Sequence, residues 1–218
     1  MVRTSNVEKK KIIREYLVDR DIENIKSWAG KDRTPLRTLA SLLFEPDPLI
    51  AWRAVEAIGV VAGIVANSNM ENVKRQLRSL LWLMNDESGS ICWNAPEAIG
   101  EILYNVPSLI DEFGIILPNY FVEEPFEKGS RWALARIAGL NRDAFGHAVP
   151  KLIDSLDSDD AGIKAFSIMI LKSLGDSSAE RQIKQMVTDQ SPVEIYDYND
   201  GELKQLTLGD IANNFLQK

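Results

Sequence analysis

Apolar side chains recur every three or four positions along most of the chain, and short polar loops separate these stretches. This periodicity predicts α-helices, because residues three and four apart share one helix face. The apolar faces that precede three of the loops consist of Leu77, Leu80, Leu81 and Met84; of Leu109, Phe113, Ile116 and Leu117; and of Ala148, Leu152, Ile153 and Leu156. The loops occupy residues 45–48, 85–88, 123–125 and 157–160. In the first loop, Asp47 followed by Pro48 is typical of the N-cap and first residue of a helix.

One pattern repeats along the sequence. Residues 51–59, 92–100 and 131–139 each carry tryptophan at the second position and glycine at the ninth, so that Trp52, Trp93 and Trp132 follow one another at nearly equal intervals. A weaker copy covers residues 163–170, where isoleucine replaces both the tryptophan and the glycine. The second helix of the first copy is apolar almost all round. Such a helix lies between neighbours, so we expect pairs of helices to stack on one another.

These copies, and above all residues 47–59, resemble the HEAT-repeat superfamily of armadillo-like α-solenoids, which have about 40 residues per helical pair. The loops ending in aspartate and the small residues of the second helices are similar to the short HEAT-like repeats first named from phycobilin lyases. The resemblance covers roughly residues 35–190. It implies an all-α, right-handed solenoid of about five helical pairs. Most proteins of this superfamily bind other proteins, and a minority bind nucleic acid or act as enzymes.

The two ends of the chain differ from the middle, as the caps of a solenoid do. Residues 5–30 predict helices with apolar faces formed by Ile12, Ile13, Tyr16, Leu17, Ile22, Ile25 and Trp28. Residues 193–198 alternate with period two and precede an Asn-Asp-Gly turn, which predicts a β-hairpin. Thr207 and Asp210 have capping-box spacing and predict a last helix up to Leu216. We expect hairpin and helix to cap the last repeat; alternatively, the hairpin offers an edge strand to a partner.

The predicted organisation is therefore a single HEAT-like repeat domain over residues 1–218. Its N-terminal cap helices occupy residues 1–33, its repeats residues 34–190, and the hairpin with its capping helix residues 191–218.

A stripe of residues on the second helices is the candidate binding site. The second, sixth and ninth positions of each copy share one helix face, so stacking would align the tryptophans, the charged residues and the glycines in rows. The predicted groove consists of Trp52, Arg53, Glu56, Trp93, Asn94, Glu97, Trp132 and Arg136. Accessible tryptophan and arginine are typical of binding hot spots. The alternative is repeat packing, with buried tryptophans and a charged ladder that joins Glu97 to Arg53 and Arg136.

The second copy departs from the first at Pro96, which stands where the first copy has Val55. A proline inside a helix removes one hydrogen bond and clashes with the carbonyl four residues earlier. The helix must therefore kink there or begin late, after residues 88–90. Either outcome leaves polar backbone near Trp93, and such local irregularity tends to coincide with functional sites. Residues 85–87 in the preceding loop are further candidates for this site.

Composition and charge narrow the function. The chain carries 25 basic and 32 acidic residues, a net charge of −7, which disfavours a nucleic-acid partner. Residues 1–40 have a net charge of +4, from 10 basic and 6 acidic residues, and the rest of the chain has −11. We expect this basic segment to be a solvated helix face, the alternative being a docking arm for an acidic partner.

Few residues of this sequence can carry chemistry. The single Cys92 and the single His147 exclude an internal disulfide and a site with two histidines. We expect Cys92 to be a buried, inert thiol and His147 a surface or capping residue. Glu56 and Glu97 could form an acid–base pair, but repetition of one segment also explains them. We predict no metal, no cofactor and no catalytic residue.

The predicted function is a non-enzymatic scaffold or adaptor that binds another protein in the groove. One alternative, implied by the resemblance, is a lyase or isomerase acting on a tetrapyrrole, with an apolar cleft near Cys92. The other is a HEAT-like nucleic-acid binder that uses Arg78, Arg131 and Arg136. No secretory signal and no apolar run of the roughly 20 residues of a membrane helix is evident, so a cytoplasmic location is expected. Sequence leaves the oligomeric state open.

Overall fold

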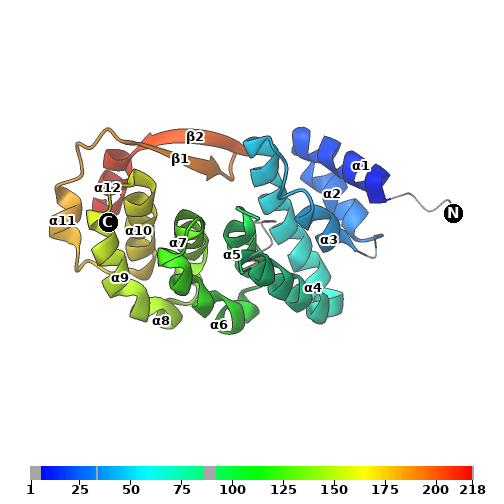
Figure 1. Ribbon diagram of the computed structural model, residues 1–218, viewed down its shortest axis with the longest axis horizontal. Helices are drawn as coiled ribbons and strands as arrows, with labels where there is room; N and C mark the ends of the chain where they lie inside the picture. The colour runs from blue at the N-terminus through cyan, green and yellow to red at the C-terminus, as the bar shows by residue number, and fades with distance from the viewer. Residues whose placement is uncertain (1–5, 33, 86–91, 218) are drawn as a thin grey trace. The chain divides into compact units, whose positions relative to one another are not determined.

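The structure, a computed structural model, describes residues 6–32, 34–85 and 92–217. It is mostly helical, with one antiparallel β-hairpin near the C-terminus (Figure 1). The chain divides into two compact units, residues 1–108 and 109–218. The predicted helical class with a small hairpin is confirmed. The single repeat domain over residues 1–218 stays a prediction.

Unit 1 is built from helices that surround one long helix. Its elements are α1 (Asn6–Val18), α2 (Ile22–Ala29), α3 (Pro35–Ala40), α4 (Pro48–Met84) and α5 (Ala95–Asn105). The predicted N-terminal helices are confirmed as α1 and α2, which bury Ile13, Leu17 and Ile25. The expected cap of α4 is also confirmed, since the Asp47 carboxylate accepts from the backbone N–H groups of Leu49 and Ile50.

Helix α4 consists of two helical stretches joined at Asn69, whose backbone is not helical (φ −153°, ψ 75°). The side chain of Asn69 accepts a hydrogen bond from the backbone N–H of Asn72 at 3.1 Å, so this residue caps the second stretch. The second stretch buries Leu77, Leu80 and Met84, as the apolar spacing predicts. The break therefore separates the two helices that the sequence pattern distinguishes.

The most extensive helix packing in unit 1 is between α4 and α5. Gly59 makes it possible, since a Cβ atom placed there would lie 2.5 Å from Cγ and 2.7 Å from the carbonyl oxygen of Glu101. The missing side chain of Gly59 thus allows α5 to approach α4 closely.

Ion pairs within unit 1 take up much of the charge of the basic N-terminal segment. Lys9 lies 2.5 Å from Asp32 and Arg14 lies 2.8 Å from Glu45. Lys10 also approaches Glu45, at 3.9 Å. These pairs favour a helix face that is satisfied within the fold over a free docking arm.

Unit 2 begins with short helical segments, many of them 3₁₀. Its helical elements are α6 (Ile110–Phe113), η2 (Gly114–Val122), α7 (Glu127–Ile137), η3 (Ala138–Leu140), α8 (Arg142–Phe145), η4 (Gly146–Ala148), α9 (Val149–Asp154), η5 (Ser155–Asp157), α10 (Ala161–Leu174), α11 (Glu180–Lys184) and α12 (Leu208–Leu216). A further turn, η1 (Pro107–Leu109), lies where the two units join along the chain. The regular helices expected before the third and fourth loops are thus replaced by short segments. Pro118 lies inside η2, where it cannot donate a backbone hydrogen bond.

The hairpin and last helix follow the sequence prediction closely. Strand β1 (Pro192–Asp197) pairs antiparallel with β2 (Glu202–Thr207), and Gly201 in the turn has φ 72°. Thr207 and Asp210 form the expected capping box of α12. Both β1 and α12 pack on α10, so hairpin and helix cover that helix as predicted (Figure 1).

Among the residues that the structure describes, one helix, α4, is long and apolar enough to cross a membrane, judged by length and composition alone. This corrects the expectation that no apolar stretch approaches membrane length. In the most apolar part of the helix, 67% of the residues are buried inside the protein, which is the pattern of a core helix. The length of α4 is therefore weak evidence for a membrane span.

Candidate functional site

The three tryptophans of the predicted stripe have three different environments. Trp52 is half-buried on α4, Trp93 is 71% exposed just before α5, and Trp132 is 5% exposed on α7. The first two belong to unit 1 and the third to unit 2. Tryptophans at equivalent positions of the sequence pattern therefore differ in how far their side chains are exposed to solvent.

Pro96 explains why Trp93 is exposed. Helix α5 begins at Ala95, with Asn94 as its N-cap and Pro96 in its first turn. Of the two outcomes predicted for Pro96, the late start is the correct one, because a proline is tolerated in the first turn of a helix. Trp93 thus precedes the helix. Residues 86–91, which include part of the candidate loop, lie outside the described residues.

Arg53 and Asn94 occupy the same position in their copies, and both support a neighbouring helix. Arg53 donates to the carbonyl oxygens of Leu17 at 3.2 Å and Val18 at 2.5 Å, at the end of α1. Asn94 donates to the carbonyl oxygen of Leu43 at 3.3 Å, just after α3. Both side chains thus bind carbonyl groups at or just beyond the end of an earlier helix. This makes their main role structural.

The two glutamates of the stripe, Glu56 and Glu97, also have different environments. Glu56 is buried and receives two hydrogen bonds from the guanidinium of Arg20, at 3.0 and 2.7 Å. Glu97 is buried as well, but within the described residues its Oε2 atom has no hydrogen-bond partner. Burial raises the pKa of Glu97 to about 8. Within the described residues the structure shows no ion pair between Glu97 and Arg53, so the charged ladder of the packing alternative finds no support at this position.

Trp132 and Arg136 of unit 2 are covered by the hairpin. The ring of Trp132 lies 5.9 Å from that of Tyr198, and the guanidinium of Arg136 lies 4.1 Å above the same tyrosine ring. Tyr196 packs edge-on against Tyr198 at 5.0 Å. The tyrosines alternate in the sequence at residues 196 and 198, but the pattern gave no sign that one would stack on the stripe. These two stripe residues therefore serve the packing of the hairpin.

Cys92, next to the exposed tryptophan, is 1% exposed. Burial raises the pKa of its thiol to about 12, with a smaller contribution from the nearby Glu97 carboxylate. A thiol with such a pKa remains protonated at neutral pH and is a poor nucleophile. The expectation that Cys92 is buried agrees with the structure.

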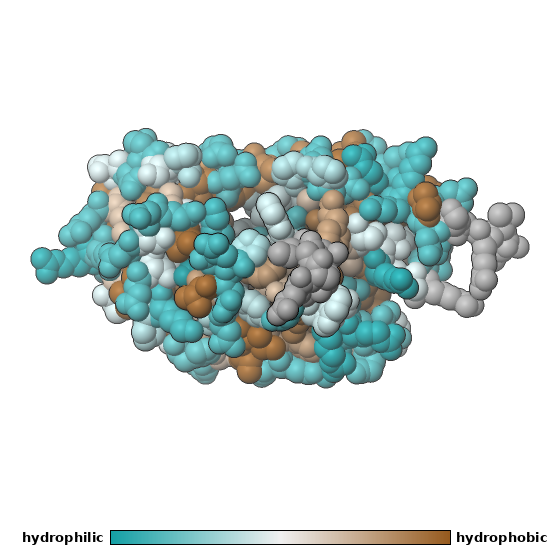
Figure 2. All heavy atoms as spheres, in the orientation of Figure 1, coloured by the Kyte–Doolittle hydropathy of each residue, from teal (hydrophilic) through white to brown (hydrophobic). Residues whose placement is uncertain are grey.

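Trp93 and Phe44 are two exposed aromatic residues of unit 1. The hydrogen bond from Asn94 to Leu43 joins the immediate neighbours of these two residues, so their backbones come close together. Phe44 is 47% exposed and Trp93 71% exposed. Phe44, Trp93 and Asn94 are called the Trp93 surface below. Hydrophilic residues predominate on the face shown in Figure 2, where hydrophobic residues form small separate patches.

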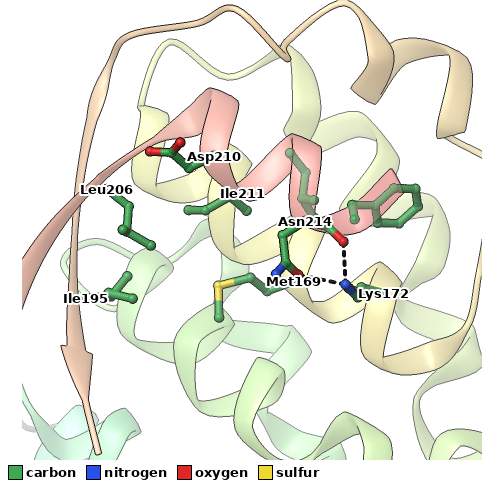
Figure 3. A pocket seen from close by; sticks show the side chains of 9 residues that line it. Met169, Lys172, Ile195, Leu206, Asp210, Ile211 and Asn214 are labelled. Atoms are coloured by element: carbon green, nitrogen blue, oxygen red, sulfur yellow. Dashed lines mark hydrogen bonds between the residues drawn. The ribbon is translucent and has the colours of Figure 1, made fainter. Parts of the chain in front are cut away.

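Unit 2 contains a cavity of about 330 Å³ between the hairpin, α10 and α12, called the α10–α12 cavity below (Figure 3). It is lined by Ile168, Met169, Lys172, Ile195, Leu206, Asp210, Ile211, Asn214 and Phe215. Ile195 and Leu206 point from the two strands toward the helices (Figure 3). Sequence reasoning did not find this cavity, because it arises from the way the hairpin closes over two helices.

Comparisons with known proteins identify a fold but no family. No known protein family matches the sequence, and no curated protein does. Two engineered proteins whose structures were solved by the Northeast Structural Genomics Consortium are similar in structure. The first has a TM-score of 0.57 at 17% sequence identity, and the match covers 99% of this chain and 92% of the engineered protein. The second has a TM-score of 0.50 at 18% sequence identity, and the match covers 87% of this chain and 52% of the engineered protein. At these identities, the likeness concerns the fold alone.

Proposed function

We propose that this chain is a HEAT-like α-solenoid protein that binds another protein through the Trp93 surface. The observation that carries the proposal is the 71% exposure of Trp93 at a position that is otherwise firmly packed. Cys92 directly before this residue and Ala95 two positions after it are buried, so the chain is packed into the fold on both sides of the exposed indole. Large aromatic side chains on a pre-organised support are the usual anchors of protein interfaces.

The proposal that the chain consists of HEAT-like repeats is supported by similar hydrogen bonds from the same position of two copies. Arg53 in the first copy and Asn94 in the second each bind carbonyl groups at or just beyond the end of an earlier helix. The interval between Trp52 and Trp93 also matches the period of a HEAT-like helical pair. The short 3₁₀ segments of unit 2 depart from regular pairs, so the count of five remains a proposal.

The charge of the chain narrows the class of partner. Residues 41–218 have a net charge of −11, and ion pairs inside unit 1 take up much of the basic charge of residues 1–40. Unit 1 as a whole is neutral, with 14 basic and 14 acidic residues, so the negative charge belongs to unit 2 and to the chain as a whole. This overall charge favours a basic partner with an apolar or aromatic anchor, since it speeds the association of basic partners and disfavours acidic competitors.

Two observations argue against the alternatives. The tetrapyrrole enzyme was expected to have an apolar cleft near Cys92, whereas Cys92 itself is 1% exposed and so offers no accessible thiol to a pigment. A nucleic-acid binder would need free arginines, whereas Arg131 is 4% exposed and donates to the carbonyl oxygens of Phe121 and Glu127. Arg136 stacks on Tyr198. A cytoplasmic location remains part of the proposal.

The test is capture of a partner by wild-type protein, Trp93→Ala and the control Val122→Ala. Val122 is 74% exposed, so both substitutions remove an exposed apolar side chain and both variants should keep the wild-type melting temperature. We expect Trp93→Ala to weaken binding of the purified partner by at least about tenfold, as hot-spot truncation does. Val122→Ala should bind like wild type. Equal affinity of Trp93→Ala and wild type would refute the proposal.

A further inference from the structure

We propose that the α10–α12 cavity binds a small apolar molecule that carries a carboxylate, such as a medium-chain fatty acid. This site belongs to unit 2 and does not depend on the Trp93 surface. Its volume of about 330 Å³ lies in the range of small-molecule sites.

The walls of the cavity are apolar and come from elements that are held together firmly. Ile168 and Met169 belong to α10, Ile195 and Leu206 to the strands, and Ile211 to α12. The backbone N–H groups at the start of α12 donate to carbonyl oxygens that precede β1, from Leu208 to Ser191 at 3.0 Å and from Gly209 to Asp189 at 2.9 Å. Hairpin and helix are thereby fixed around the cavity, which favours a formed pocket over a collapsed one.

Lys172 supplies the charge that would recognise an anion. Its ammonium group donates to the carbonyl oxygen and to the side-chain oxygen of Asn214, the latter at 2.7 Å (Figure 3). Both acceptors are neutral, and within the described residues no carboxylate forms an ion pair with Lys172. An ammonium has three donors, so one donor and the whole positive charge are left for a ligand. A carboxylate is the natural complement.

Asp210, the carboxylate in the cavity wall, is committed to the fold. Its Oδ2 atom accepts from the backbone N–H of Thr207 at 2.9 Å and from the hydroxyl of Thr207 at 2.7 Å. The backbone hydrogen bond from Thr207 holds the pKa of Asp210 below its ordinary value. Asp210 stands one helical turn before Asn214, near Leu206, and Lys172 lies at the other end (Figure 3). The ligand's carboxylate would thus lie at the Lys172 end and its apolar body among the isoleucines.

A second hollow, of about 320 Å³, shares Lys172 and Phe215 with the cavity. Its other lining residues are polar or acidic in part: Gly175, Asp176, Ser177, Glu180, Leu216 and Gln217. An apolar chain gains less by entering such a surface than by remaining among the isoleucines. The composition of the two hollows therefore directs the ligand's apolar body into the α10–α12 cavity.

The experiment uses octanoate and the neutral 1-octanol as probes of the full-length protein, with calorimetry for affinity and amide chemical shifts for location. We expect wild type to bind octanoate with a Kd of about 1 mM or tighter and to shift signals of Met169, Leu206 and Ile211. Lys172→Met keeps the apolar stem but removes the charge. It should weaken octanoate about tenfold and leave 1-octanol unchanged. The control Lys164→Met removes a lysine two turns earlier on α10 and should change neither.

A second variant, Leu206→Trp, enlarges a half-buried residue of the cavity wall and should weaken both probes. Absence of octanoate binding in wild type would overturn the proposed site. So would shifts confined to other residues. Equal octanoate affinity of wild type and Lys172→Met would overturn the recognition of a carboxylate.

Discussion

The carboxyl group of Glu97 lies inside unit 1 and, within the described residues, its Oε2 atom has no hydrogen-bond partner. Burial raises the pKa of this group from its ordinary value of 4.5 to about 8. The protonated form therefore predominates in the folded protein at neutral pH, while the unfolded chain carries the anion. Folding takes up a proton between these two values, so stability falls as the pH rises through this window.

Glu97→Gln should remove this pH dependence. We expect wild type and variant to have similar free energies of unfolding below about pH 4, where the Glu97 carboxyl is mostly protonated in the folded and in the unfolded protein. At pH 8, the variant should be more stable than wild type by on the order of 4 kcal/mol, because most of the free energy of the linked proton uptake has then been lost from wild type. Urea unfolding at several pH values measures the difference. The exposed Glu15→Gln is the control, and parallel curves for wild type and Glu97→Gln would contradict the prediction.

The tryptophans can be separated by their response to acrylamide. Trp93→Phe removes an emitter that is 71% exposed and should lower the fraction of emission that is readily quenched. Trp132→Phe removes one that is 5% exposed and should raise that fraction. Trp52→Phe, at a half-buried position, should have an intermediate effect. The opposite signs of the first two changes make the measurement independent of absolute quantum yields, and equal signs would contradict the burial described above.

At the level of the elements, two glycines allow backbones to approach closely. Gly59 lets α5 pack on α4, and Gly209 lets α12 pack against the segment before the hairpin. A Cβ atom at Gly209 would lie 2.7 Å from the carbonyl oxygen of Val187 and 2.9 Å from that of Asp189. Backbone atoms cannot move aside as a flexible side chain can. These contacts fix where the helices lie, so a methyl group must separate them.

Gly59→Ala and Gly209→Ala should therefore each destabilise the protein by about 2–4 kcal/mol, as overpacking against backbone does. Gly146→Ala is the matched control, because a Cβ atom there has no heavy atom within 4 Å and the backbone is right-handed helical. It should be neutral or stabilising by about 0.5 kcal/mol. Thermal unfolding of the three variants measures these changes in stability. A destabilisation by Gly146→Ala as large as that by the other two substitutions would contradict the prediction.

The elements also show where sequence patterns were sufficient and where they were not. Local rules predicted the cap at Asp47, the capping box at Thr207 and the hairpin, because each depends on residues a few positions apart. The pattern before the third loop predicted one regular helix. The chain forms mainly 3₁₀ turns there, since Pro118 breaks the hydrogen-bond ladder. Periodicity records which residues are buried but not which kind of helix buries them.

The candidate site required information that local patterns lack. The late start of the helix at Pro96 was one of two predicted outcomes. The sequence therefore indicated an irregular backbone near Trp93, but not that the Trp93 side chain would be exposed. The burial of Trp132 depends on Tyr198, which lies far later in the chain and comes close only through the hairpin. The α10–α12 cavity has the same origin. Contacts between distant segments therefore decide which stripe residues remain accessible.

At the level of the whole molecule, charge is distributed unevenly between the basic N-terminal segment, residues 1–40, and the remainder. Ion pairs inside unit 1 compensate part of the basic segment, and the chain as a whole has a net charge of −7. An acidic protein attracts basic partners over a distance, and dissolved salt screens this attraction.

Association with the proposed partner should therefore slow by about tenfold or more between 0.05 and 0.5 M NaCl, while dissociation changes less. Stopped-flow or surface-based kinetics with the purified partner measures both rates. Trp93→Ala provides the complementary case, since loss of an apolar anchor should act mainly on dissociation. An association rate that does not depend on salt would contradict a basic partner, and it would leave the role of Trp93 to be judged by the mutant alone.

The late start of α5 has a consequence for how repeated segments diverge. All three copies keep the tryptophan, but only the second has a proline three positions after it. In the first copy the ring stays half-buried on a continuous helix, and in the second it is exposed before a shortened one. The proline at the position of Val55 explains this difference, because it is tolerated only in the first turn of a helix and so leaves the preceding tryptophan outside α5. The repeated pattern places a tryptophan in each copy, and the local backbone geometry determines whether its side chain is packed or exposed.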